Sequence, residues 1–267
     1  DKALEAGAEA LALYQQCEDR EGQGVVLLNM SSAHMLKEQI NTALEVAGEA
    51  QALFQELEHR QRQAQASFFI AEAYLRGERY EPALQAATKA RQLCQSVGVK
   101  VEEADVLAFI GQCNLALAGR IGDSKDKDEQ KRARKLFLAA LKAGKEGLAL
   151  ARKLVADDPK RVLLSNLLMI VAQSQGALGK SKEALKAANE ALKIARENAD
   201  QLAECSAHVL LAQVHFWNDR PDDARREVST GLDFARRLQD DYLESLAAGL
   251  LEQLDPSAAL AGSARAA

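Results

Sequence analysis

Proline, aromatic residues and cysteine are all scarce in this chain of 267 residues. It holds four prolines and four cysteines, and 4% of its residues are aromatic. β-Branched and aromatic residues favour strands, whereas this chain is rich in Ala, Leu, Glu, Lys, Gln and Arg, which favour helices. Alanine alone makes up roughly a fifth of the chain, well above ordinary usage. These scarcities argue against a β protein and predict an all-α fold.

The chain also lacks an excess of positive charge and a long apolar run. Its net charge is −5 and its isoelectric point is near 5.6, which argues against general binding to nucleic acid or to an anionic membrane. The longest uncharged run, 162–179, contains several amides and has a helical hydrophobic period. A bilayer span would leave these amides in hydrocarbon, so we predict a packed helix and no transmembrane segment.

The cysteines and the amino terminus bear on the compartment. Cys17, Cys94, Cys113 and Cys205 are scattered and form no CxxC pair, so we expect free thiols in a reducing compartment. No signal peptide is visible. We therefore expect a soluble protein of the cytoplasm, or of an organelle interior if a targeting segment was removed. The chain begins with Asp1 rather than Met, so it is expected to be a fragment or a processed product.

Small residues recur at one register along the chain and indicate an internal repeat. Spacings of four and three place each triplet on one stripe of a helix, where small side chains let a neighbouring helix approach closely. Another helix with apolar residues at matching offsets precedes each of these. The clearest triplets are Ala43, Ala47 and Ala50; Ala83, Ala87 and Ala90; and Ala184, Ala188 and Ala191.

The segment 178–192, with its turn glycine Gly179 and the small residues Ala184, Ala188 and Ala191, resembles the tetratricopeptide repeat (TPR). The usual TPR period is about 34 residues, whereas this chain runs at about 40. It therefore resembles the long-period repeats of kinesin light chains and of maltose-regulator-class proteins, over about residues 2–240. The resemblance implies a right-handed α-solenoid of antiparallel helix pairs, a TPR-like superhelix.

We predict one solenoid over 1–254, in which an orphan helix precedes five helix pairs and one closing helix follows them. The third pair carries an insertion over 121–132, whose alternating Lys and Asp residues predict a solvated loop or a charged contact for a partner. A flexible tail follows the solenoid. The predicted bounds are 2–20 for the orphan helix, 22–60, 62–98, 100–157, 159–198 and 200–239 for the pairs, 241–254 for the closing helix and 255–267 for the tail.

Three patterns suggest chemistry, and the repeat accounts for each. The segment 176–181 resembles the end of a phosphate-binding loop, but Ser174 stands where that loop requires glycine. Cys205, His208 and His215 share one helical face and could ligate zinc, but both histidines occupy positions that the repeat directs into its core. Paired carboxylates such as those at 102–103 lie at helix starts, where the helix dipole favours them. We predict no enzyme, no cofactor and no metal.

In TPR solenoids the first helix of each pair lines the concave face, and the resemblance implies the same here. The middle position of each helix is Ser, Glu or Gln, which can hydrogen-bond a peptide backbone, and Phe68 and Phe216 serve as apolar anchors. None of these positions is basic, so capture of a terminal carboxylate is not implied and we expect little effect of salt. The predicted partner-binding residues are Leu28, Ser32, Met35, Phe68, Glu72, Leu75, Gln112, Leu115, Met169, Gln173, Val209, Gln213 and Phe216.

The predicted function is a non-catalytic scaffold for protein–protein interaction, or a subunit of a multiprotein complex, that holds a protein or peptide segment in this groove. The alternative is a regulatory or sensor arm of a larger protein. In that case the effector domain, as in a transcription regulator or a motor adaptor, would lie outside this chain.

Overall fold

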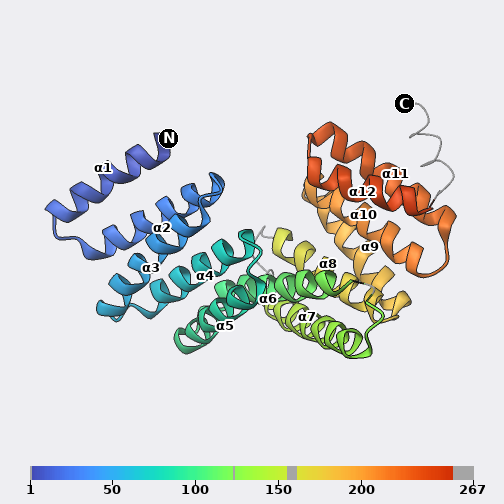
Figure 1. Ribbon diagram of the computed structural model, residues 1–267, viewed down its shortest axis with the longest axis horizontal. Helices are drawn as coiled ribbons and strands as arrows, with labels where there is room; N and C mark the ends of the chain where they lie inside the picture. The colour runs from blue at the N-terminus through green and yellow to red at the C-terminus, as the bar shows by residue number, and fades with distance from the viewer. Residues whose placement is uncertain (1, 123, 155–160, 255–267) are drawn as a thin grey trace. The chain divides into compact units, whose positions relative to one another are not determined.

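The computed structural model describes residues 2–122, 124–154 and 161–254, and every regular element in these ranges is an α-helix (Figure 1). The predicted all-α class is therefore confirmed. None of the described helices has the length and apolar content that a membrane crossing needs. The twelve described helices are α1 (Lys2–Gln16), α2 (Arg20–Leu36), α3 (Ile40–Glu56), α4 (Arg60–Arg76), α5 (Tyr80–Val97), α6 (Lys100–Ile121), α7 (Lys127–Leu154), α8 (Arg161–Ala177), α9 (Ser181–Glu197), α10 (Gln201–Trp217), α11 (Pro221–Leu238) and α12 (Asp241–Leu254).

The helices form two compact units, which divide between Arg120 and Ile121. In the first unit α2 packs on α3 and α4 on α5, and in the second α8 packs on α9 and α10 on α11. Each of these pairs is joined by a short turn, so its helices run antiparallel, as predicted. The predicted pairing of α6 with α7 would cross the division between the two units, and so would a single solenoid over 1–254. Both therefore stay predictions. The tail 255–267 and the limits 157 and 159 lie outside the described residues.

A stripe of alanine side chains on each second helix forms the centre of the core. All nine alanines of the three triplets have an exposed fraction of 0%. Glycine has the same role in the second unit, where a Cβ on Gly231 would lie 2.9 Å from Cγ2 of Val209 on the preceding helix. Small residues therefore set a close helix–helix distance. The stripe predicted from the sequence is confirmed.

The turns between helices share one backbone conformation and recur every 20 residues. Glu18, Glu38, Glu58, Glu78 and Gly98 all have positive φ in the first unit, as do residues 179, 199, 219 and 239 in the second. In each turn the next backbone N–H donates to a carbonyl five residues earlier, as His59 does to Phe54 at 3.0 Å. Two helices of 17 or 18 residues, each followed by a short turn, thus account for the 40-residue period.

The predicted loop over 121–132 is wrong for its second half, because α7 begins at Lys127. The Asp126 side chain accepts a hydrogen bond from the backbone N–H of Asp128 at 2.7 Å, and the Asp126 carbonyl accepts one from Gln130 at 2.9 Å. The helix dipole also favours the acidic side chains in the first turn of α7, which stabilises the start of the helix. Residues 127–132 therefore extend α7 to 28 residues, and they are helical rather than a charged loop.

Candidate functional site

Three of the predicted partner-binding residues belong to the core, and their assignment is corrected here. Leu28, Met35 and Val209 are 4%, 4% and 2% exposed. Leu28 packs with Ala47 and the rest of one core cluster, and Met35 packs in another. Val209 packs over Gly231. On their helices these side chains lie at the edges of the row of predicted partner-binding positions. There the facing helix offers small residues and leaves room for a large one.

The other predicted residues are reached by solvent in part or in full. In the first unit these are Ser32 on α2, Phe68, Glu72 and Leu75 on α4, and Gln112 and Leu115 on α6. In the second unit they are Met169 and Gln173 on α8, and Gln213 and Phe216 on α10. Each unit therefore presents polar side chains beside apolar ones on its first helices. Their role in binding stays a prediction.

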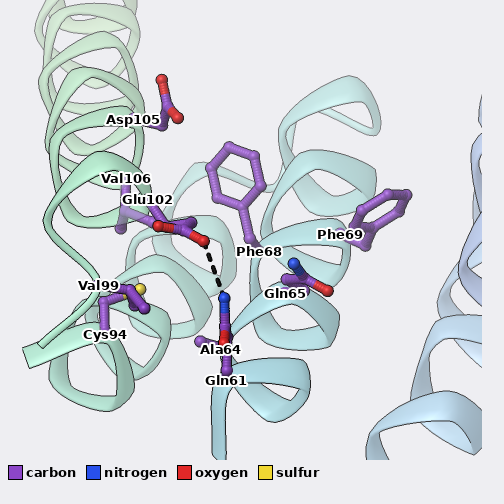
Figure 2. A pocket seen from close by; sticks show the side chains of 10 residues that line it. All are labelled: Gln61, Ala64, Gln65, Phe68, Phe69, Cys94, Val99, Glu102, Asp105 and Val106. Atoms are coloured by element: carbon purple, nitrogen blue, oxygen red, sulfur yellow. Dashed lines mark hydrogen bonds between the residues drawn. The ribbon is translucent and has the colours of Figure 1, made fainter. Parts of the chain in front are cut away.

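A small apolar pocket opens between α4 and α6 in the first unit, with a volume of about 90 Å³. Figure 2 shows Phe68 on α4 directed towards α6, where Val106 and Glu102 lie. Phe68 also packs edge-on against Phe109, with ring centroids 5.2 Å apart and planes at 70°. Of the predicted residues only Phe68 lines this pocket. The full lining is Gln61, Ala64, Gln65, Phe68, Phe69, Cys94, Val99, Glu102, Asp105 and Val106.

Two carboxylates, Glu102 and Asp105, stand at the rim of this pocket on successive turns of α6. The Gln61 amide donates a hydrogen bond to Oε1 of Glu102 at 3.1 Å, and this bond is the dashed line in Figure 2. Asp105 is exposed. From the sequence we predicted only that the helix dipole stabilises the carboxylates at 102–103. No sequence pattern indicated that Glu102 borders a pocket.

The neighbouring carboxylate Glu103 has a different, structural role. It is buried, and it accepts hydrogen bonds from Lys100 at 2.8 Å and from Gln95 at 2.7 Å. Burial pushes the pKa of Glu103 upwards, but these hydrogen bonds and the nearby Lys100 and Arg91 charges outweigh it and hold the pKa below its ordinary value. Lys100 therefore forms an ion pair with Glu103.

The thiol at the base of the pocket is inert. Burial, with added repulsion from Glu102 and Glu103, raises the pKa of Cys94 to about 11, so the thiol is protonated at neutral pH. Burial raises the pKa of Cys113 to about 12. A thiolate nucleophile is therefore absent from this pocket at neutral pH.

A second hollow, of about 350 Å³, lies between α10 and α12 in the second unit. Phe216 lines it together with Trp217 and Tyr242, which are 46% and 75% exposed. Its polar lining is uncharged and consists of Gln213, Ser245 and Gln253. The sequence predicted Phe216 and Gln213 here but missed Tyr242, because α12 was treated only as a closing helix. It also missed Trp217, which follows the predicted position Phe216 on α10.

Of the three side chains that resembled a zinc site, Cys205 and His208 are buried in the core, whereas His215 is half-buried. The Cys205 thiol donates to the Gly231 carbonyl at 3.2 Å. His208 is 5% exposed, with Nδ1 2.7 Å from the Glu227 carboxylate and Nε2 3.2 Å from the Arg196 guanidinium. Within 2–122, 124–154 and 161–254 the structure brings together no group of three potential metal ligands. This agrees with the interpretation of His208 as a core histidine.

The glycine that resembled a phosphate loop lies in an interhelix turn. Gly179 has φ +74° between α8 and α9, and the next N–H, of Lys180, donates to the Gln175 carbonyl at 2.8 Å. The turn has the same conformation as the other turns of the repeat. Its glycine is accounted for by this positive φ.

Glu72, on the predicted groove, has a carboxyl that the fold keeps partly away from water. Burial raises its pKa above the ordinary value of 4.5, and the Arg76 charge offsets only part of this effect. Ionising Glu72 therefore costs free energy in the folded state but not in the unfolded one. Its contribution to stability is highest below pH 4.5 and is lost as pH rises through the folded pKa.

Glu72→Gln is therefore expected to raise the melting temperature at pH 7, and the gain should shrink as the pH falls to 4.5 and below. The amide has the same size and carries no charge to desolvate. Melting curves from pH 4 to 8 measure this, with Glu45→Gln on the exposed face of α3 as the matched control. A lower melting temperature for Glu72→Gln at pH 7 would contradict the expectation.

Comparisons with known proteins agree with this fold. No protein-family model and no curated protein sequence matches the chain. Among solved structures it is similar to aspartyl phosphate phosphatase F from Bacillus subtilis, with a TM-score of 0.67, 13% identity and coverage of 92% of this chain. It is also similar to kinesin light chain TPR-like repeats of Podosopora anserina, with a TM-score of 0.56, 12% identity and coverage of 80% of this chain and 94% of that one.

A third similar structure is that of a Rap protein complexed with Competence and Sporulation Factor, with a TM-score of 0.54, 16% identity and coverage of 94% of this chain and 70% of that one. Such identities show the fold alone. The chain spans 60% of the length of the phosphatase structure. The chain thus has the fold of a TPR-like repeat protein, as its resemblance to the long-period repeats implied.

Proposed function

We propose that the chain is a non-catalytic interaction module that binds a protein or peptide segment on the first helices of its repeats. The pocket between α4 and α6 is the observation that carries this proposal, because it is an apolar opening beside exposed polar groups. The proposed contact residues are Ser32, Phe68, Glu72, Leu75, Gln112 and Leu115 in the first unit and Met169, Gln173, Gln213 and Phe216 in the second.

The similar structures support this function to different degrees. The Rap protein is complexed with Competence and Sporulation Factor, so a related fold binds another molecule. The phosphatase is named for an activity, but it shares 13% identity and is longer than this chain. Catalysis here would need an activated group, and Cys94 in the α4–α6 pocket is protonated at neutral pH. The α4–α6 pocket therefore supplies no thiolate nucleophile, and we propose binding rather than catalysis.

A second candidate is a regulatory or sensor arm of a larger protein. The chain spans 60% of the phosphatase structure and 70% of the Rap structure, but 94% of the kinesin light chain repeats. The same binding surface would serve both functions. A full-length sequence with an appended effector domain would favour the second candidate.

A random dodecapeptide library displayed on phage and selected on the intact chain tests the proposed binding. We expect enriched peptides whose affinity falls at least tenfold, or about 1.4 kcal/mol, when a bulky side chain blocks the first helices in Gln112→Trp or Gln173→Trp. The matched controls Glu49→Trp and Lys186→Trp place the same ring on exposed positions of second helices. The proposal fails if no peptide is enriched or if the control variants weaken binding equally.

A further inference from the structure

We infer that the pocket between α4 and α6 accepts one apolar side chain of the bound segment, and that its acidic rim binds a lysine or arginine next to that side chain. This inference rests on the proposed function and specifies the chemistry of the partner at one position. It concerns the first unit alone.

The size and walls of the pocket select a single side chain. Sites for cofactors and drug-sized ligands have volumes of about 300–1,000 Å³, whereas this pocket has about 90 Å³. Its walls include Ala64, Phe68, Val99 and Val106, which offer carbon atoms and no charge. A leucine, isoleucine, methionine or phenylalanine side chain can leave water here and contact these walls.

The rim selects the charge of the neighbouring residue. Glu102 and Asp105 are the charged residues that line the pocket, and both are acidic. They lie three residues apart on α6, so they project from adjacent turns of the same face. Gln61 binds one oxygen of Glu102 and fixes the orientation of the carboxylate. Two carboxylates on one face favour a cation and repel an acidic segment.

The wider charge of the first unit acts in the same direction. Residues 1–120 contain 17 acidic and 11 basic residues, so the net charge of this unit is −6. The net charge of the whole chain is −5. The nearest lysine on α6, Lys100, is hydrogen-bonded to Glu103 at 2.8 Å. The pocket rim is thus an acidic site on an acidic unit. Complementary charge increases the rate of association and selects basic partners.

The same dodecapeptide selection tests this inference through the composition of the enriched peptides. We expect an apolar residue with a lysine or arginine within two positions of it. We expect Glu102→Gln combined with Asp105→Asn to weaken binding of these peptides at least tenfold, and raised salt to weaken binding to the unchanged chain. This salt effect replaces the small one expected from the sequence, which did not include the carboxylates at 102 and 105 among the binding positions. Glutamine can still accept the hydrogen bond from Gln61, so the double variant should fold. The matched control is Glu45→Gln combined with Glu49→Gln on α3, which contributes no residue to the pocket.

Two synthetic versions of an enriched peptide separate the pocket from general charge attraction. In one version alanine replaces the apolar residue, and in the other the apolar and basic residues are moved apart within the same composition. Both are expected to bind at least fivefold more weakly to the intact chain. Equal binding of either version overturns the inference.

The outcomes distinguish this inference from the proposed function. If peptides are enriched and are blocked by Gln112→Trp or Gln173→Trp, but lack the apolar–basic pair or bind the Glu102 and Asp105 double variant equally, the inference falls and the proposed function stands. If no peptide is enriched, both fall. If the α3 control weakens binding as much as the double variant, the rim has no specific role and the inference falls.

Discussion

Ala188→Phe is expected to lower the free energy of unfolding by about 1–3 kcal/mol, because a packed core does not admit an added ring without strain. Ala188 is 0% exposed on α9, which packs against α8 on one side and α10 on the other. Ala184 and Ala191 on the same stripe are also fully buried. The ring must therefore separate α9 from its neighbours. Urea denaturation followed by circular dichroism measures the loss as a lower midpoint.

Lys186→Phe is the matched control for this change. Lys186 lies on the same helix but is exposed, so the same ring is added without displacing a neighbour. A surface substitution of this kind changes stability by about 0.5 kcal/mol or less. If both variants unfolded at the same urea concentration as the parent, the stripe would not determine the helix–helix distance in this unit.

The alanine stripe was predictable from the sequence because its physical cause is local. Spacings of four and three are visible in the sequence, and a repeated small residue has one common explanation, the close approach of another helix. The order of antiparallel pairs followed from the same spacing. The division into two units was not predictable, because the repeat spacing does not show where the contacts within one compact unit end and those of the next begin.

The turns show where such local signals fail. In the segment 76–79 glycine is the obvious turn residue, but Gly77 has an ordinary φ of −82° and Glu78 has the positive one. A Cβ on Gly77 would lie 3.0 Å from Cγ2 of Ile40, so this glycine permits a close contact. The left-handed position is held instead by the hydrogen bonds of the turn, such as that from Arg79 to the Tyr74 carbonyl at 2.8 Å. Glutamate carries no sequence signal for this conformation.

The site was predicted less well than the fold, for a related reason. The resemblance to TPR proteins identified which helices present the groove, and Phe68 does line the pocket there. It did not identify which large side chains turn inwards, because that depends on the size of the residue on the facing helix. Met35, for example, packs with Ala43 and Ala73. The pocket itself is built from three helices, α4, α5 and α6, and no single segment encodes it.

Two aromatic residues that the sequence treated as equivalent anchors differ in their surroundings, and this difference leads to the second large expected effect. Phe68 packs against the core cluster that contains Phe109. Phe216 is 37% exposed in the hollow beside Trp217. The aromatic contact contributes about 0.5–1.5 kcal/mol beyond the area that Phe68 buries. Phe68, which the sequence predicted only as an apolar anchor of the groove, therefore also packs against the core.

Phe68→Ala is expected to lower the free energy of unfolding by about 2–4 kcal/mol, somewhat less than the roughly 3–5 kcal/mol for truncating a fully buried ring, because Phe68 is only partly buried. Phe216→Ala, the matched control, should lower it by about 1 kcal/mol or less, because water already reaches that ring. Urea denaturation of both variants beside the parent measures the difference. Phe68→Leu restores much of the lost volume without the ring, so it should recover part of the stability, while the edge-on contact with Phe109 stays absent. If Phe68→Ala and Phe216→Ala were equally stable, the ring of Phe68 would have no structural role in the wall of the pocket, and the packing of α4 on α6 through Phe68 and Phe109 would be wrong.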